Sequence, residues 1–280
     1  MFKKMMAAIV ALLMVLTCFV GCSGDASEHA VSLDGLYTPE GWTEEKGTLT
    51  IGLDDTFAPM GFRDTEGYLV GFDIDLAVAV GDELGMQVKF QPIDWNSKEV
   101  ELDSGRIDCI WNGMSATTER QEIMQLTNQY LNNRIVVMVK KGVSVNTVEE
   151  LAALNIGTQA GSASFEVMEA HEKFADFSAK IQTYDTYDEV IMALDAGRVD
   201  CMVVDEVLGS YKNNQAGNPY EVAAFNFGDD YYAIGCKKGN TELVDKLNNA
   251  IKTLIDNGEA AEISNKWFGK NVVIFEGYGE

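Results

Sequence analysis

A nine-residue motif occurs twice in this chain, and it constrains the fold more than any other feature. Residues 102–110 read Leu-Asp-Ser-Gly-Arg-Ile-Asp-Cys-Ile, and residues 194–202 read Leu-Asp-Ala-Gly-Arg-Val-Asp-Cys-Met. Each copy predicts a helix that ends at its glycine, Gly105 or Gly197, because a residue without Cβ can take the left-handed turn that closes a helix. A short apolar strand follows. The repeat therefore predicts two similar α/β lobes.

Polar residues follow the strand in both copies. The first strand leads into Trp-Asn-Gly-Met-Ser at 111–115, and the second into Val-Val-Asp-Glu at 203–206. Ligands of open α/β sheets sit outside the carboxyl ends of the strands. We therefore expect these two loops to face each other across a ligand-binding cleft.

The charge of the chain excludes some classes of partner. The formal net charge is −23 over 280 residues. Nucleic-acid binding needs clustered Lys and Arg to replace the counterions of the phosphates. We therefore expect no nucleic-acid partner and no polybasic membrane-binding surface.

The N-terminus is typical of an exported protein. Lysines at positions 3 and 4 precede an almost wholly apolar stretch up to residue 20, which predicts a secretory signal peptide over residues 1–21. Phe-Val-Gly-Cys at 19–22 resembles a bacterial lipoprotein cleavage box. It predicts acylation of Cys22, a linker to residue 46, and anchoring to the outer face of the cytoplasmic membrane, Gram-positive type, or a periplasmic location. The alternative is a cleaved signal without lipid.

The body of the chain alternates predicted strands and helices. Strand patterns at 47–53 and 86–93 flank a helix pattern whose apolar residues, Phe72, Leu76, Val80 and Leu84, repeat every fourth position. Further strands are expected at 130–139, 155–158, 181–184, 221–227 and 229–237. This order predicts a mainly parallel sheet with covering helices in each lobe. We interpret Cys109, Cys201 and Cys236 as small buried apolar residues, because each sits in a strand-like apolar run, and their spacing fits no zinc site.

The residues expected at the cleft suggest a ligand with two opposite charges. Arg120 offers a planar fork for a carboxylate, and Ser115 and Gly161-Ser162 stand at helix starts, where anions are favoured. Asp205 could bind an ammonium group, and Asp54 lies near Phe57 in another loop after a strand. Each residue also has a simpler interpretation: Arg120 as an exposed helix charge, Asp205 as a helix cap, and Asp54 as a turn residue.

Four segments together resemble the solute-binding proteins of polar amino acid ATP-binding-cassette importers: residues 51–59, 67–77, 105–120 and 204–207. The resemblance covers about residues 47–268. It implies a two-lobe periplasmic-binding-protein fold of type II with two crossover strands. It places the first lobe at 47–131 and 230–280 and the second at 132–229.

The resemblance also implies roles for individual residues. Arg120 would bind the ligand carboxylate and Asp205 its ammonium group. Asp54 and Phe57 would contact the ligand side chain, with Trp95 nearby. The rest of the cleft would be lined by Asn112, Gly113, Ser115, Gly161, Ser162, Ala163 and Ser164. Relatives often carry Tyr at the position of Phe57, Ser-Ser at 112–113 and Glu at the position of Gly61, so the side-chain preference stays open.

The expected function is capture of a polar amino acid, of the arginine/lysine, glutamine or cystine type, by closure of the two lobes about the crossovers. The partners would be the free L-amino acid and the membrane permease subunits with their ATPase. We expect a monomer with no cofactor, no metal and no catalytic residues. The alternatives are a detached amino acid sensor lipoprotein and a dehydratase-like enzyme on the same fold.

Overall fold

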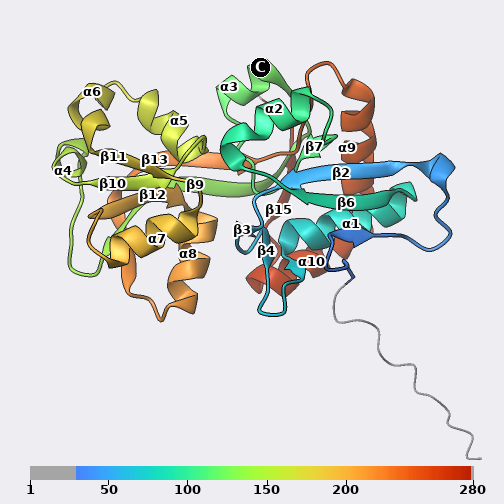
Figure 1. Cartoon of the computed structure of the whole chain (residues 1–280), viewed down its shortest axis with the longest axis horizontal. Coiled ribbons are helices and arrows are strands. Elements are labelled where there is room, and N and C mark those ends of the chain that lie inside the picture. Colours follow the sequence, from blue (N-terminus) through green and yellow to red (C-terminus); the bar gives the residue numbers. More distant parts are fainter. Residues whose placement is uncertain (1–29, 279–280) are drawn as a thin grey trace, which may run out of the picture.

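The computed structural model describes residues 30–278, so the predicted signal peptide, the proposed lipidation at Cys22 and residues 23–29 lie outside the described residues. Figure 1 shows two lobes side by side, each built on its own sheet. We call the lobe that carries β2 and β6 the first lobe, and the lobe that carries β10 and β12 the second lobe. Two long strands run between them.

The first lobe contains a sheet of strand order β1-β6-β2-β7-β14-β8. The central strands β6, β2 and β7 are parallel, as predicted, while β1, β14 and β8 pair antiparallel. The sheet is therefore mixed, because β14 enters it from the returning crossover. Its strands are β1 (Leu36–Tyr37), β2 (Thr48–Leu53), β6 (Gln87–Pro92), β7 (Cys109–Ile110), β8 (Met124–Leu126) and β14 (Gly235–Lys237).

The helix predicted from the apolar repeat is α1 (Phe72–Leu84), and its C-cap Gly85 has a φ of 64°, the left-handed conformation that ends a helix. Phe72, Leu76 and Val80 are fully buried in the core. A small sheet precedes α1, formed by β3 (Thr56–Phe57), β4 (Gly61–Arg63) and β5 (Leu69–Val70). The other helices of this lobe are α2 (Lys98–Asp103), α3 (Thr118–Ile123), α9 (Thr241–Asp256), α10 (Glu259–Phe268) and the 3₁₀ turns at Glu44–Lys46 and Trp95–Ser97.

The second lobe has strand order β11-β10-β12-β9-β13, and β15 pairs with β9 at the border with the first lobe. Strands β11, β10 and β12 are parallel, and β9 and β13 are antiparallel. Its strands are β9 (Gln129–Lys140), β10 (Ile156–Gln159), β11 (Ile181–Tyr184), β12 (Cys201–Asp205) and β13 (Tyr220–Tyr232), while β15 (Val273–Glu276) pairs with the first-lobe end of β9. Its helices are α4 (Val148–Ala152), α5 (Ala163–Glu169), α6 (Phe174–Phe177), α7 (Tyr187–Asp195), α8 (Glu206–Gln215) and a 3₁₀ turn at Ser178–Lys180.

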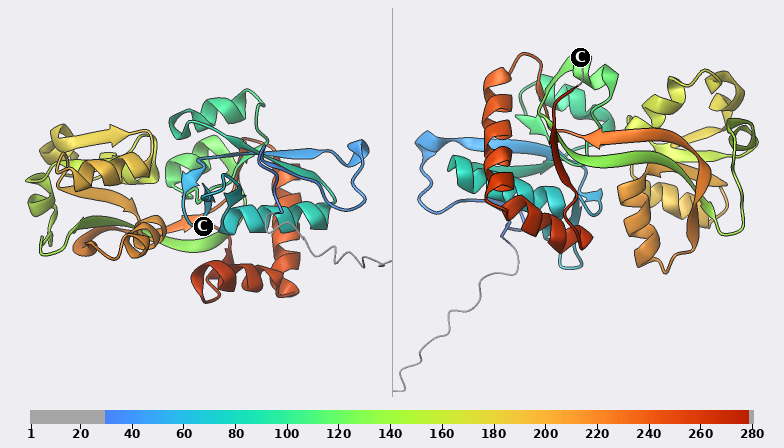
Figure 2. Two further views of the ribbon diagram at one scale, coloured as in Figure 1. Left: turned by 60° about the horizontal axis from the view of Figure 1, so that its bottom comes forward. Right: turned by 180° about the vertical axis from the view of Figure 1, so that it is seen from behind.

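Strands β9 and β13 connect the two lobes, and they lie side by side in both views of Figure 2. Their pairing runs from Leu131 opposite Tyr232 to Lys140 opposite Tyr220. The prediction of two separate strands at 221–227 and 229–237 was wrong, because a single bulged strand covers the break. The register shifts between Val222 and Gly228 absorb the irregular sequence there without ending the strand.

The repeated motif has the predicted local structure in both lobes. Gly105 and Gly197 have φ values of 72° and 69°, and the strands that follow belong to different sheets. Among the described residues, the cysteines Cys109, Cys201 and Cys236 are buried free thiols, as predicted.

The chain already packs on the first lobe at Val31, within the range expected to be a linker. Val31 is buried, and Leu36 pairs with Lys89 as β1 joins the edge of the first sheet. No helix within residues 30–278 is long and apolar enough to cross a membrane.

Candidate ligand-binding site

A small cavity of about 10 Å³ lies between the two lobes. Such a volume holds about one water molecule. It is lined by Phe57, Trp95, Gly113, Ser115 and Arg120 from the first lobe and by Gln159, Ser162, Ala163 and Asp205 from the second. The two copies of the repeated motif lead into β7 and β12, and the segments at the ends of these strands thus meet at this cavity.

The first-lobe wall is formed by the loop after β7. Gly113 has a φ of 55°, and a Cβ there would lie 2.8 Å from the ring of Phe57. Its backbone N–H donates to Asp73 Oδ2 at 2.6 Å. Asp73, in the first turn of α1, also accepts a hydrogen bond from Tyr130 Oη. Burial raises the pKa of Asp73 to about 7. Asp73 therefore fixes the loop without lining the cavity.

Arg120 lies in the first turn of α3 and is only 1% exposed. Thr117 is the N-cap of this helix, and its hydroxyl accepts the N–H of Arg120 at 3.3 Å. Arg120 Nη1 donates to the backbone oxygen of Ser115 at 3.1 Å. The interpretation of Arg120 as an exposed helix charge was therefore wrong.

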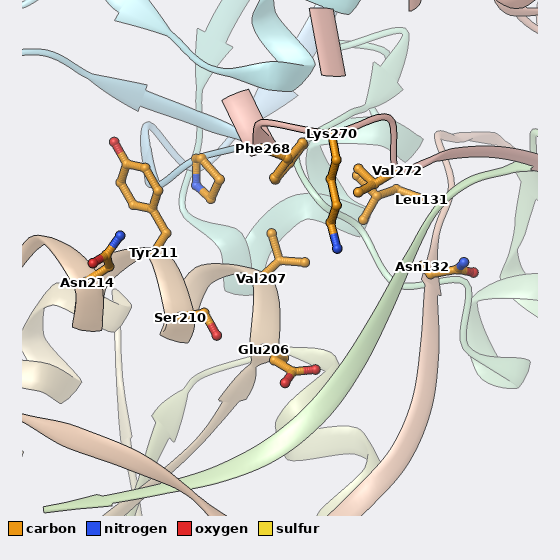
Figure 3. A pocket seen from close by; sticks show the side chains of 11 residues that line it. Leu131, Asn132, Glu206, Val207, Ser210, Tyr211, Asn214, Phe268, Lys270 and Val272 are labelled. Atoms are coloured by element: carbon orange, nitrogen blue, oxygen red, sulfur yellow. The ribbon is translucent and has the colours of Figure 1, made fainter. Parts of the chain in front are cut away.

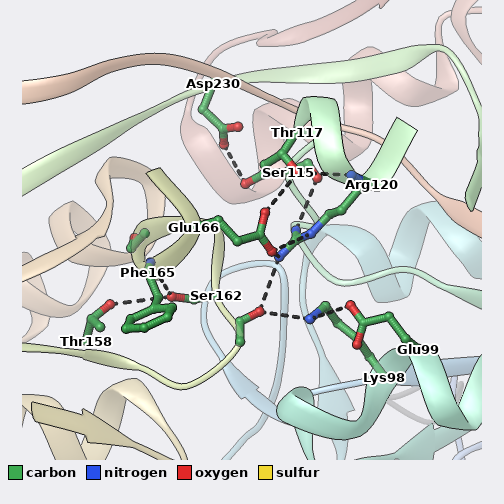
Figure 4. A network of polar contacts seen from close by, with 12 residues as sticks. Lys98, Glu99, Ser115, Thr117, Arg120, Thr158, Ser162, Phe165, Glu166 and Asp230 are labelled. Atoms are coloured by element: carbon green, nitrogen blue, oxygen red, sulfur yellow. Dashed lines mark hydrogen bonds and ion pairs between the residues drawn. The ribbon is translucent and has the colours of Figure 1, made fainter. Parts of the chain in front are cut away.

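Figure 4 shows that Arg120 also bonds to the second lobe. Its Nε and Nη2 donate to Glu166 Oε1 at 3.1 and 2.7 Å, and Nη2 donates to the Gly161 oxygen at 3.3 Å. Thr117 Oγ1 donates to Glu166 Oε2 at 2.9 Å. The buried Lys98 donates to the same Gly161 oxygen at 2.8 Å and pairs with Glu99.

Asp205 is the last residue of β12 and occupies the N-cap position of α8. Its side chain makes no capping hydrogen bond, so the interpretation of Asp205 as a helix cap holds for its position alone. Oδ1 accepts from Asn133 Nδ2 at 2.7 Å and from Tyr232 Oη at 2.9 Å. Burial, followed by the nearby charge of Asp230, raises its pKa to about 7.

Asp230 is a second carboxylate beside Asp205. It accepts from Asn133 Nδ2 at 2.8 Å and from Ser115 Oγ at 2.7 Å, so one amide group bridges the two acids. Burial raises the pKa of Asp230 as well. This end of the cavity therefore strongly favours a cation, and Arg120 marks where an anion is favoured.

Asp54 lies behind the cavity lining. Its Oδ1 accepts from the N–H and the hydroxyl of Thr56, and its Oδ2 accepts from Gln159 Nε2 of the second lobe at 2.7 Å. Burial raises the pKa of Asp54, and these hydrogen bonds oppose the rise. Asp54 is thus a buried carboxylate whose charged form the second lobe stabilises by a hydrogen bond.

The remaining predicted residues surround the cavity. Asn112 turns away from it: Oδ1 accepts the Asp54 N–H at 3.2 Å, and a Cβ on Gly61 would lie 2.5 Å from Nδ2. The side chain of Asn112 therefore occupies the space that a side chain at position 61 would need. Ser162 caps α5 through the N–H of Phe165, and Ser164 accepts from Tyr187 Oη.

The structure therefore brings most of the predicted residues to the cavity wall and places Asp54, Asn112, Gly161 and Ser164 just behind it. Sequence reasoning missed Gln159, Asn133, Asp230, Tyr232 and Glu166. Gln159 could have been found, because it is the last residue of a strand at the cleft edge. The other four depend on contacts between distant parts of the chain.

A larger cavity of about 500 Å³ lies beside α8 (Figure 3), where Lys270 and Val207 point toward each other. It is lined by Pro59, Leu131, Asn132, Glu206, Val207, Ser210, Tyr211, Asn214, Phe268, Lys270 and Val272. Neither Arg120 nor Asp205 lines it. Its charged lining residues are Glu206, which already pairs with Arg134, and Lys270. Within the described range, no group of three or more His, Cys, Asp or Glu residues could hold a metal ion.

The chain matches known solute-binding proteins over most of its length. Residues 49–270 match the family described as bacterial extracellular solute-binding proteins, family 3. A solved substrate-binding protein of an uptake transporter from Streptococcus pneumoniae, with bound histidine, has 39% sequence identity and a TM-score of 0.78, covering 82% of this chain and 95% of that one. An ancestral arginine-binding protein bound to arginine has 36% identity and a TM-score of 0.74, covering 80% and 99%.

A curated relative matches over nearly the whole chain. The L-cystine-binding protein TcyA of Bacillus subtilis is 28% identical over 275 residues, which is 96% of this chain and 99% of that protein. The fold is that of the type II periplasmic amino acid-binding proteins, as the sequence predicted. The chain belongs to family 3 of the bacterial extracellular solute-binding proteins.

Proposed function

We propose that this protein binds a free polar L-amino acid between its lobes and delivers it to the permease of an ATP-binding-cassette importer. The observation that carries the proposal is the pair Arg120 and Asp205 in the wall of one small cavity between the lobes. A guanidinium suits a carboxylate, and a buried carboxylate suits an ammonium group. Together they match the two charged groups that every free amino acid carries.

The side chain of the ligand would lie toward Asp54, Phe57 and Trp95. Phe57 and Trp95 give this part of the wall apolar faces, and the carboxylate of Asp54 disfavours an acidic side chain. A polar or cationic ligand of the arginine/lysine, glutamine or cystine type agrees with these groups. Relatives named for histidine, arginine and cystine support this choice.

Binding would proceed by hinge closure about β9 and β13. Both strands run between the lobes, and lobe-spanning contacts such as Gln159 with Asp54 require the closed arrangement. A ligand that touches both lobes favours the closed form by its differential affinity. With these strands as the hinge, we place in the first lobe the described residues up to 131, with β1 at its edge, and those from 230 onward, and in the second lobe residues 132–229.

Export and anchoring complete the proposal. The family is extracellular, and the basic and apolar N-terminal sequence supports cleavage after residue 21. Acylation of Cys22 would then hold the protein, as a monomer, at the outer face of the cytoplasmic membrane. The closed form would dock on the permease subunits.

The site contacts favour binding over turnover. A general acid or base must reach the reacting group. His171 instead packs against Phe177, Phe225 and Phe227 in the second lobe. Asp54, Asp205 and Asp230 each accept hydrogen bonds from neighbouring protein groups.

A thermal-shift screen of the chain from residue 22 against the common amino acids tests the proposal. An amino acid that binds only the folded state stabilises it and so raises the melting temperature. At a concentration of 100 times the Kd, the stabilisation is about 2.7 kcal/mol. We expect a rise with one or a few polar amino acids, and none for Arg120→Ala or Asp205→Ala. Arg106→Ala is the matched control, because Arg106 is exposed and pairs with Glu101 away from the cavity. No rise with any amino acid would overturn the proposal.

A further inference from the structure

Glu166 forms an ion pair with Arg120 across the boundary between the lobes. The carboxylate belongs to α5 of the second lobe, and the guanidinium to α3 of the first. Two N–H groups of Arg120 donate to one carboxylate oxygen, at 3.1 and 2.7 Å, and Thr117 donates to the other at 2.9 Å. Both oxygens of Glu166 are therefore held by the first lobe. We call Glu166, Arg120 and Thr117 the interlobe latch.

The latch uses the side of Arg120 that does not serve the cavity. Arg120 lines the cavity, whereas Glu166 does not. A guanidinium has five N–H groups in a fixed plane. Nε and Nη2 bond to Glu166 and Gly161, and Nη1 bonds once to Ser115, which leaves one N–H of Nη1 with no acceptor among the described residues. Glu166 thus fixes the plane of Arg120 and leaves a donor of Nη1 for another carboxylate.

The latch can exist only when the lobes are together. Its bonds join residues that lie on different lobes and are separated by more than forty positions. Charge-assisted hydrogen bonds are stronger than neutral ones, particularly where solvent is largely excluded. Arg120 is 1% exposed, so separation of the lobes would also return a desolvated charge to water.

The other polar contacts between the lobes differ in kind. Lys98 donates to a backbone oxygen, that of Gly161, and Gln159 is a neutral amide that donates to Asp54. The hydrogen bonds between Glu166 and Arg120 join two side chains of opposite charge. They are the ones that do so among the hydrogen bonds described between the lobes around this cavity. The charge of Glu166 therefore stabilises the closed arrangement of the lobes by electrostatic attraction, which a neutral side chain would not provide.

We propose that Glu166 is a positioning residue that favours closure of the lobes and orients Arg120 for the carboxylate of the ligand. The second part rests on the proposed function, and the first does not. Closure is stabilised by the protein itself, and the ligand adds to it. Loss of Glu166 then opens the cleft, lowers affinity and speeds release.

Small-angle X-ray scattering of the chain from residue 22, with no amino acid added, tests the first part. We expect Glu166→Gln and Glu166→Asp to have a larger radius of gyration than the wild type. Gln keeps the shape without the charge, and Asp keeps the charge but is shorter. Glu169→Gln is the matched control, because Glu169 is exposed on the same helix. Equal radii in the wild type and both Glu166 variants, with native circular dichroism, would overturn the latch.

Stopped-flow tryptophan fluorescence, to which Trp95 at the cavity wall contributes, tests the second part with L-arginine, L-histidine, L-cystine and L-glutamine. For any of these that binds the wild type, Glu166→Gln should weaken binding about 10-fold, mostly through faster release. Unchanged release rates would overturn the positioning role. If none binds the wild type, the proposed function fails, and with it the positioning role, while the scattering result still decides the latch.

Discussion

Gln159 of the second lobe donates a hydrogen bond to Asp54 of the first, with 2.7 Å between Nε2 and Oδ2. Gln159 lines the cavity, and Asp54 lies directly behind it. The amide also donates to the backbone oxygen of Asp185, so it is held in place from two sides. A ligand side chain that enters here meets an amide in front of a carboxylate.

Asp54→Asn should change selectivity rather than abolish binding. The substitution removes a negative charge near the ligand side chain but leaves Arg120 and Asp205 in place. We expect the affinity for L-arginine to fall about 10-fold, and that for L-glutamine to change less, because a charged partner strengthens a buried hydrogen bond. Isothermal titration measures both. Asp55→Asn is the control, since Asp55 pairs with Arg63 outside the cavity. Equal losses for both amino acids would contradict the role of Asp54.

Amino acid binding should weaken as the pH falls. The pKa of Asp205 is raised to about 7, first by burial and then by Asp230, while Tyr232 and Arg120 lower it. An ammonium group binds only the ionised carboxylate, so affinity at about pH 5.5 should be roughly 10-fold or more below that at pH 8. Binding near pH 6.5 should release a proton, which calorimetry detects as a heat that depends on the buffer. A pH-independent affinity would contradict this assignment.

Asp205 should make the folded state without ligand less stable as the pH rises, whereas it makes ligand binding stronger. Without bound amino acid, the folded state holds the proton of Asp205 more tightly than the unfolded chain, whose pKa is near 3.8. The stability from this proton is fully present below about pH 4 and is lost as the pH rises through about 7. Asp205→Asn should therefore raise the urea midpoint at pH 8 more than at pH 5. A larger gain at pH 5 would contradict the raised pKa.

Gly71 should be required for the fold of the first lobe. It precedes α1 with a φ of 141°, and a Cβ there would overlap the backbone carbonyl of Met60. Gly71→Ala should cost roughly 2–4 kcal/mol of the free energy of unfolding, from backbone strain and steric overlap. Gly105→Ala separates the two causes, because Gly105 also has a positive φ but no atom within 4 Å of the added Cβ. It should cost about 1 kcal/mol. Equal melting temperatures of the two variants would contradict the overlap with Met60.

Local sequence patterns predicted the elements that depend on local physics. The helix α1 follows from its apolar repeat and the glycine after it, and the two copies of the motif follow from their own glycines. The positions of Arg120 and Asp205 at the cleft follow from the strand ends that precede them.

The contacts across the cleft could not be predicted in the same way. Glu166 lies on an amphipathic helix, where an acidic residue usually faces solvent, and only closure brings it to Arg120. Asn133 reaches both Asp205 and Asp230 because β9 and β13 pair in one register. The continuity of β13 through its bulges also depends on its partner strand, because its own sequence reads as two strands.

Calorimetric titration with an amino acid and two of its derivatives tests the central claim most directly. For L-arginine the derivatives are agmatine, which lacks the carboxylate, and Nα-acetyl-L-arginine, whose amine carries no charge. If arginine is the amino acid that stabilises the protein in the screen, it should bind the wild type at least about 100-fold more tightly than either derivative. Agmatine offers no carboxylate to the remaining Nη1 donor of Arg120, and the acetylated amine brings no positive charge to Asp205. Other amino acids are tested with the corresponding derivatives. Binding of a derivative as tight as that of the parent amino acid would contradict the claim that Arg120 and Asp205 recognise the two charged groups of the ligand.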